Sequence, residues 1–360
     1  MAKNLRISLT NQYTISEKKI DFSKLQALDE DDLDSWWRTV PGARRFMKTA
    51  IDAVDKHCAI AAHLPQFDTA GFVQILREKI QRRHVFLMVE IFEYEGKGDA
   101  EEFVDALKAE FAPNFRRDFT EDSPMADLAL QDPLSGYAII ILLKNKSNWL
   151  TTAVTDFNKN TANMGSSLIF VTNEENPPPS LTRLSDYLTP YDIQFFALNL
   201  LENARLTVQE KLYTSTLAAK LSGQSSQLAK NFAKTELYTH GLDFVKSVLP
   251  HFDEKIFNRA VWECQTQFIL PILEQLRGRL IEKHYDRLRN IMHVTDEFGK
   301  TLDDPWDMEL RHLHYYGGKK MLFQYGDWEK LERAYSARND LSHLKTIELS
   351  QMEKIFLFAE

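Results

Sequence analysis

The sequence predicts an α/β layer domain in its N-terminal part, followed by an all-α helical bundle. Over residues 31–205, short apolar runs alternate with helical patterns. This alternation is typical of a mainly parallel sheet that is buried on both faces. Beyond residue 205 the strand patterns stop and the apolar residues follow helical spacing. At 360 residues the chain is long enough for two or three folding units.

The elements of the α/β region follow from the spacing of its apolar residues. Acidic residues near position 30 are suited to cap a helix. That helix continues at 3.6-residue spacing with Phe46, Met47, Ile51 and Val54. Strands are predicted at 57–65, 84–94, 136–144 and 166–174, with helices at 72–83, 99–112 and 149–161. The apolar segment 191–201 is interpreted as a further strand, alone or followed by a helix. This order indicates a Rossmann-like layer domain.

The C-terminal third is predicted to be helical throughout. A long helical pattern over residues 258–292 contains Pro271, where a kink or a helix start is expected. A turn is expected at Gly326-Asp327, before the last two helices. The pattern predicts about four helices in an antiparallel bundle. We therefore divide the chain into an N-terminal extension (1–30), an α/β regulatory or sensor domain (31–205), a helical connector (206–252) and a bundle (253–360).

The composition excludes several classes of protein. The net charge of −8 and the pI near 5.8 argue against a protein whose whole surface coats DNA. No apolar run is long enough to span a bilayer, and the N-terminus has no secretion signal, so we expect a cytoplasmic protein without a membrane partner. Cys58 and Cys264 are too few for a disulfide framework or a cysteine zinc site, and both are interpreted as reduced core thiols. No cofactor or metal site is predicted.

The segment SARNDLSHLK, residues 336–345, carries the candidate catalytic residues. On a helix, Asn339 and His343 lie one turn apart on the same face, and Asp340 flanks His343. Arg338 lies about 140° round the helix from His343, so only its long side chain or a second subunit would bring both into one cleft. An imidazole can transfer protons near neutral pH, and a guanidinium binds phosphate oxygens. This pair suits cleavage of RNA by its own 2′-hydroxyl group.

The string RNDLSH, late in a helical bundle, resembles the R-x4-6-H motif of the HEPN superfamily, over about residues 255–360. The resemblance implies a metal-independent endoribonuclease that acts as a homodimer through the bundle. It implies that Arg338 contacts the scissile phosphate, that His343 is the acid or base, and that Asn339 supports them. Relatives with such fusions often act as toxins or anti-phage defence effectors, which implies RNA as the substrate and a regulatory protein partner.

Three other interpretations stay open. Arg338 can instead pair with an acid on the helix surface while His343 is a half-buried bundle residue. The protein can be a non-catalytic HEPN-containing scaffold of a defence complex, which the acidic net charge favours slightly. The α/β region also resembles a degenerate nucleotide-switching domain of the STAND or AAA+ kind, but the glycines and lysine of a phosphate loop are missing after its first strand, where AHLPQFDTAGF stands.

Overall fold

The computed structural model describes residues 25–96, 98–115, 123–145, 148–161, 165–174, 177–296, 299–318 and 322–358. The described chain forms two compact units. The α/β unit contains the residues up to Leu200 together with Ser222–Asn231. The helical unit contains Leu201–Leu221 and the residues from Phe232 onward. The predicted N-terminal extension lies outside the described residues as far as residue 24. Within the described ranges, no helix has the length and apolar character needed to cross a bilayer.

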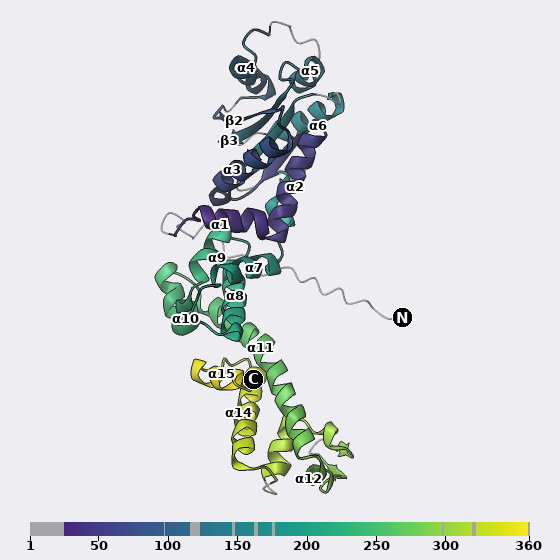
Figure 1. Ribbon diagram of the computed structural model, residues 1–360, viewed down its shortest axis with the longest axis vertical. Coiled ribbons are helices and arrows are strands. Elements are labelled where there is room, and N and C mark those ends of the chain that lie inside the picture. The colour runs from purple at the N-terminus through teal and green to yellow at the C-terminus, as the bar shows by residue number, and fades with distance from the viewer. Residues whose placement is uncertain are drawn as a thin grey trace. The chain divides into compact units, whose positions relative to one another are not determined.

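A five-stranded parallel sheet forms the centre of the α/β unit (Figure 1). Its strands are β1 (Ala59–His63), β2 (Met88–Tyr94), β3 (Tyr137–Leu143), β4 (Ser167–Thr172) and β5 (Thr182–Arg183). They are ordered β2-β3-β4-β1-β5, and every pairing is parallel. In the register, Ile140 lies opposite Ile169, and Ala61 lies opposite Phe170. β3 and β4 are buried along almost their whole length, as expected for the centre of a sheet covered on both faces. The predicted parallel sheet is confirmed.

Helices pack on this sheet at the positions that the apolar spacing predicts, with α5 as an addition. The unit contains α1 (Glu30–Asp34), the π-helical turn η3 (Ser35–Thr39), α2 (Pro41–Asp55), α3 (Gln66–Arg83), α4 (Ala100–Phe111), α5 (Pro124–Gln131), α6 (Leu150–Asn160), the 3-10 turn η4 (Leu184–Asp186) and α7 (Pro190–Leu200). α2 buries Phe46, Met47, Ile51 and Val54, as its spacing requires. α5 was not predicted, and it contributes Met125 and Leu128 to the core.

The interpretation of residues 191–201 as a strand is wrong, because this segment is the helix α7. The Asp192 carboxylate accepts a hydrogen bond from the Thr189 N–H (2.8 Å), and the Asp192 N–H donates to the Thr189 hydroxyl (3.3 Å). This reciprocal cap, with Pro190 at the first helical position, starts a helix. The fifth strand is instead β5, two residues that no apolar pattern marks.

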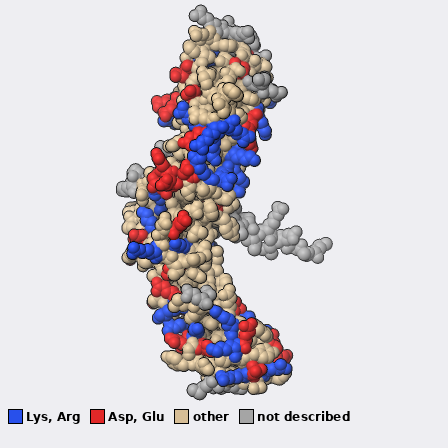
Figure 2. All heavy atoms as spheres, in the orientation of Figure 1, with Lys and Arg blue, Asp and Glu red and all other residues tan. Residues whose placement is uncertain are grey.

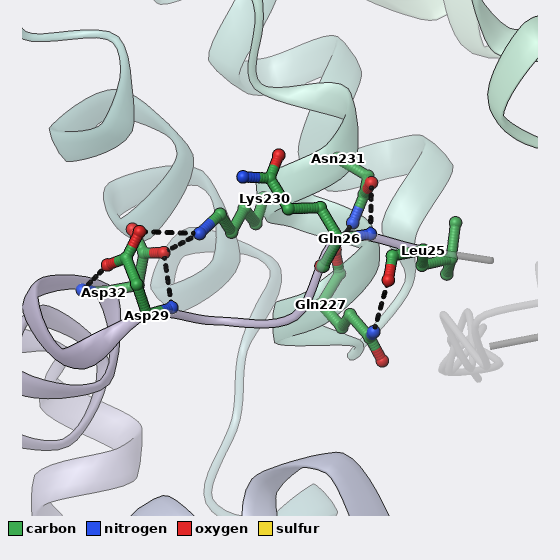
Figure 3. Close-up of polar contacts among 7 residues, drawn as sticks. All are labelled: Leu25, Gln26, Asp29, Asp32, Gln227, Lys230 and Asn231. Carbon is green, nitrogen blue, oxygen red and sulfur yellow. Dashed lines mark hydrogen bonds and ion pairs between the residues drawn. The ribbon is translucent and has the colours of Figure 1, made fainter. Parts of the chain in front are cut away.

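Residues 222–231, which include most of α9 (Ser226–Phe232), belong to the α/β unit although they follow α8 (Val208–Ser222) in the sequence. Figure 3 shows the reason: Lys230 lies between the Asp29 and Asp32 carboxylates, at 3.0 Å from Asp29 Oδ2 and in contact with Asp32. In the same view, the Asn231 side chain bonds the backbone of Gln26 in both directions (3.1 and 2.9 Å). The segment is therefore held to α1 and to the residues before it, by ion pairs with Asp32 and Asp29 and by hydrogen bonds to the Gln26 backbone.

The helical unit is built on the 30-residue helix α11 (Glu254–Lys283). Its other elements are α8 as far as Leu221, α10 (Thr235–Val248), α12 (Tyr285–Arg289), β6 (Val294–Thr295), β7 (Thr301–Leu302), the 3-10 turn η5 (Pro305–Asp307), α13 (Leu310–His312), the π-helical turn η6 (Leu313–Gly317), α14 (Tyr325–Ser342) and α15 (Leu349–Phe356). α14 and α15 pack against α11 and against each other. The C-terminal region is thus helical, as predicted.

Several details of the helical unit differ from the sequence-based expectations. α11 continues through Pro271, so no helix starts there. Gly326 and Asp327 lie inside the first turn of α14 and form no separate turn. β6 and β7 pair as a short antiparallel hairpin, which the helical spacing did not predict.

The two cysteines occupy different environments. Cys264 is buried in α11, and burial raises the pKa of its thiol to about 12. Cys58 is only partly buried, and its thiol donates to the Lys56 carbonyl. The interpretation as a core thiol is therefore right for Cys264 and wrong for Cys58.

Candidate active site

The candidate motif lies at the C-terminal end of α14. This helix presents an apolar stripe, Leu331, Ala334, Ala337 and Leu341, and all four residues are buried. The two alanines permit a close approach of α14 to α11, against which it packs. Arg338, Asn339 and Asp340 follow Ala337 in the last turns of the helix, and Leu341 is their last buried neighbour. The packing of α14 thus fixes the backbone that carries the motif.

His343 is the residue at which the helix ends. Its N–H donates to the carbonyl oxygens of Asn339 and Asp340, each at 3.1 Å. Leu344 follows with a φ of +58°, and the N–H of Lys345 donates to the Asp340 carbonyl (2.9 Å). This is a Schellman-type end with a leucine in the left-handed position, which glycine usually occupies. The expected spacing of one turn between Asn339 and His343 is present, but His343 is the C-cap rather than an internal helical residue.

The four side chains of the motif differ in exposure, and the described part of the chain gives them no polar partner. Arg338, Asn339 and Asp340 are half-buried and His343 is exposed. Among the described residues, none of these side chains makes a hydrogen bond or an ion pair. The alternative in which Arg338 pairs with a surface acid and His343 is half-buried therefore does not describe this structure. A guanidinium and an imidazole near one helix end are both available to a ligand.

Contacts from α11 hold the chain that follows the motif. The Trp262 indole N–H donates to the Leu341 carbonyl (2.8 Å). The buried Gln265 amide donates to the Ile347 carbonyl and accepts from the Ile347 N–H, both at 2.7 Å. Sequence reasoning missed both residues. A polar Gln265 on the otherwise apolar stripe of α11 was the available signal, because a buried amide requires hydrogen-bond partners.

An open groove of about 700 Å³ lies beside the end of the motif. It is lined by Asn258, Arg259, Trp262, Leu344, Lys345 and Thr346. The groove therefore combines an indole with two cationic side chains, directly after His343. Aromatic faces and cations of this kind are the groups that bind the bases and phosphates of a single-stranded nucleic acid.

The other histidines near the bundle have structural partners. His284 is buried, and its Nε2 lies 2.8 Å from the Asp327 carboxylate. His314 stacks on Tyr335, with 4.2 Å between the ring centroids. His312 is buried, with its Nε2 3.4 Å from the Asp296 carboxylate. The described part of the chain contains no group of three or more histidine, cysteine or acidic residues that could hold a metal ion.

A second candidate site, for a nucleotide, is the junction between β1 and α3. A phosphate loop needs several residues between the strand and the helix, whose N–H groups cradle the phosphates. Only Leu64 and Pro65 separate His63 from Gln66, and the Leu64 N–H is already bonded to the Thr172 carbonyl (3.2 Å). The Asp68 carboxylate also lies in the first turn of α3 and would repel a phosphate. This junction does not have the form of a phosphate-binding loop.

Asp68 is itself unusual, because its side chain is fully buried. Its Oδ1 accepts a hydrogen bond from the Ser226 hydroxyl (2.6 Å), while Oδ2 has no partner among the described residues. Burial raises the pKa of this carboxyl to about 7, and the hydrogen bond from Ser226 opposes that shift. The carboxyl therefore changes charge near neutral pH inside the α/β unit.

Comparison with known proteins gives little further information. The sequence matches no protein-family model and no curated protein. Among solved structures, it is similar to the ORC2 protein of Aeropyrum pernix in its ADPNP–ADP complexes, with 9% identity and a TM-score of 0.29. The similarity covers 92% of this chain and 94% of that chain. A score this low supports no statement about fold or ligand, so the HEPN resemblance rests on the motif and its place in the bundle.

Proposed function

We propose that this protein is a metal-independent endoribonuclease of the HEPN type that acts as a dimer. One observation supports this function best. Arg338 and His343 lie at the end of α14, beside an open groove with Trp262 and Lys345, and their side chains form no hydrogen bond or ion pair among the described residues. Neither side chain has a structural partner among the described residues that would explain its presence there.

The proposed reaction uses the substrate's own nucleophile. An imidazole takes the proton of a ribose 2′-hydroxyl group, and the 2′-oxygen attacks the adjacent phosphorus. The bond from phosphorus to the 5′-oxygen breaks, and that oxygen receives a proton. Arg338 binds the non-bridging phosphate oxygens, whose negative charge increases in the transition state. The products are a 2′,3′-cyclic phosphate and a free 5′-hydroxyl group.

This reaction favours two copies of the chain. The attacking and leaving oxygens lie on opposite sides of the phosphorus, so the proton acceptor and the proton donor must also lie on opposite sides. Each copy supplies one His343 in the motif. Two motifs that face each other across a two-fold axis would supply both groups, and they would also bring Arg338 of one copy near His343 of the other.

The first test is digestion of RNA in the presence of EDTA. We expect cleavage by the wild-type protein and a loss of roughly 10²–10⁴-fold in His343→Ala and Arg338→Ala. His251→Ala and Arg289→Ala are matched controls, because both residues are exposed on the helical unit. Intact RNA with the wild-type protein, or equal cleavage by His343→Ala, would refute the proposed site.

The second test addresses the dimer. In this proposal the site needs His343 from both copies, so a mixed dimer of wild type and His343→Ala is inactive. After subunit exchange with an excess of His343→Ala, the activity should therefore fall well below that of the same amount of wild-type protein alone. Unchanged activity, although mass analysis detects mixed dimers, would show that each site is formed within one copy.

The proposed activity would harm a cell that produces it without control. We therefore expect a toxin or anti-phage effector whose α/β unit restrains the helical unit. Expression of the wild type should arrest growth, and expression of His343→Ala should not. The alternative is a non-catalytic scaffold of a defence complex, which the net charge of −8 favours. In that case Arg338→Ala would change assembly while cellular RNA stays intact.

A further inference from the structure

A cluster of basic side chains lies on α2 and α3, in the α/β unit and apart from the motif of α14. Figure 2 shows lysine and arginine side chains gathered over the region where Figure 1 draws these two helices. The cluster consists of Arg44, Arg45 and Lys48 on α2, Lys79, Arg82 and Arg83 on α3, and Arg38 in η3, just before α2. Its local density contrasts with the net charge of −8 for the whole chain. We call it the α2–α3 basic face.

Three of these cations are neutralised by neighbouring acids. Arg38 bonds both Asp34 (2.7 Å) and Glu78 (2.8 Å). Arg83 bonds Asp55 (2.5 Å). Arg45 lies 3.9 Å from the Asp192 carboxylate and donates to the Tyr187 carbonyl (3.1 Å). The nearby acids Asp34, Glu78, Asp55 and Asp192 are thus already used inside the α/β unit.

The other four cations have no such partner. Among the described residues, Arg44, Lys48, Lys79 and Arg82 make no side-chain hydrogen bond or ion pair. Arg44 and Lys48 are one turn apart on α2, and Lys79 and Arg82 are one turn apart on α3, which packs against α2. Glu78 directly precedes Lys79 but bonds Arg38, and Asp52, one turn after Lys48, forms no ion pair with Lys48 in the described part of the chain. Four cations on two neighbouring helices therefore have no acid bonded to them among the described residues.

The charges of this face also act on one another. Partial burial lowers the pKa of Lys79, and the positive charges of Arg38 and Arg44 lower it further. These residues are therefore close enough to repel each other in the free protein. An anion with several charges, placed over the face, would relieve this repulsion at all positions together.

We infer that the α2–α3 basic face binds the phosphate backbone of a nucleic acid. A chain of phosphodiesters supplies the repeated negative charges that two rows of cations require, and such contacts need no particular base sequence. The apolar residues of both helices, including Phe46, Met47, Phe72 and Leu76, are turned into the core. They are therefore not available to enter a bilayer, which a membrane-binding helix requires. This inference does not depend on the nuclease activity, because it concerns a different unit of the chain.

The inference is tested with the full chain carrying His343→Ala, so that RNA cannot be consumed, and a short fluorescein-labelled RNA. We expect binding with little sequence preference and with an affinity that falls steeply as salt is added. The variant Arg44→Gln with Lys48→Gln should bind roughly tenfold more weakly. The slope of log K against log salt should decrease by about 1.4, or about 0.7 for each lost contact to a single strand.

A matched control separates this site from the effect of overall charge. Lys159→Gln with Lys255→Gln removes the same charge from two exposed lysines on α6 and α11. This control should bind RNA as the unchanged chain does. Equal weakening in both double variants, or no RNA binding at all, would overturn the inference.

Two other anionic partners are outcomes of the same experiment. Val85 and Phe86 follow α3 and are 78% and 99% exposed, so vesicles with anionic lipids are included as a competitor. Glu30 and Asp31 on α1 are exposed acids of the same unit, so the oligomeric state is measured with and without Arg44→Gln and Lys48→Gln. Preference for vesicles over RNA, or loss of a dimer without loss of RNA binding, would contradict the assignment of the face to nucleic acid.

Discussion

The Trp262 indole N–H donates a 2.8 Å hydrogen bond to the carbonyl oxygen of Leu341, and so joins α11 to the helix end that carries the motif. The same indole lines the groove beside Lys345. The same carbonyl also accepts from the Leu344 N–H (3.2 Å), so the indole adds a second hydrogen bond at the helix end. Because Leu341 lies two residues before His343, this bond both stabilises the packing of α14 on α11 and fixes the backbone that carries His343.

Replacement of this indole should weaken the helix end. Trp262→Phe keeps an aromatic ring but removes the N–H, so we expect a loss of about 1 kcal/mol in the free energy of unfolding of the helical unit. Trp306→Phe is the matched control, because the structure gives its indole no hydrogen bond among the described residues. Urea unfolding measures both. Equal effects of the two substitutions would show that the bond to Leu341 contributes nothing.

Replacement of Leu344 by glycine should stabilise the same helix end. Leu344 has a φ of +58° and a side chain that is 72% exposed, so its left-handed backbone costs free energy while its side chain gains little from burial. We expect Leu344→Gly to raise the free energy of unfolding by about 1 kcal/mol. Leu344→Ala removes the side chain but keeps the strain, and it should give no gain. A glycine variant that is less stable than the alanine variant would contradict this explanation.

The buried carboxyl of Asp68 should make the stability of the α/β unit depend on pH. Its pKa is about 7 in the folded chain and near 3.8 in the unfolded chain. Between these values the folded state holds a proton that the unfolded state has lost, so stability decreases as the pH rises from about 4 to about 7 and is then constant. A difference of about 3 pH units corresponds to at most about 4 kcal/mol.

Asp68→Asn checks this dependence. The amide oxygen can still accept the hydrogen bond from Ser226, but the group does not ionise. The variant should be more stable than the wild type at pH 8 and similar to it near pH 4. Thermal unfolding across this pH range is the measurement, with Asp52→Asn, a change at a half-buried position of the same unit, as the control. A constant difference between Asp68→Asn and the wild type at all pH values would refute the assignment.

Removal of the Lys230 ammonium should destabilise the α/β unit. Burial lowers the pKa of Lys230, but hydrogen bonds to Asp32 and Asp29 raise it more, so the pKa lies above its ordinary value and the lysine is charged. Lys230→Met leaves the largely buried Asp32 carboxylate without a cation. We expect a loss of about 2–3 kcal/mol, less than for a fully buried pair, because Asp29 is 65% exposed.

A second substitution tests the cause of that loss. Asp32→Asn in the Lys230→Met background removes the unpaired charge and should recover part of the stability. The midpoint of urea unfolding is compared for the two single variants, the double variant and the wild type. Additive losses in the double variant would show that Lys230 and Asp32 do not act as a pair.

The α7 segment shows where the sequence held more information than its apolar pattern alone. An 11-residue apolar run cannot by itself distinguish a buried strand from a buried helix. The residues Thr189, Pro190 and Asp192 at its start carry a capping signal that favours a helix, and the structure uses that signal. β5 gives no comparable signal, because two residues become a strand only through their pairing with Ala62 and His63 of β1.

By itself, the sequence determined the parallel sheet of four apolar strands, the helices between them, the helical C-terminal region and the residues of the candidate motif. These features depend on local spacing, which a linear chain displays directly. Only the tertiary structure decided that residues 222–231 join the α/β unit. It also decided that Arg338 and His343, and four cations of α2 and α3, have no side-chain hydrogen bond or ion pair among the described residues. Each of these features depends on which side chains meet from distant parts of the chain, and that is fixed by packing rather than by local pattern.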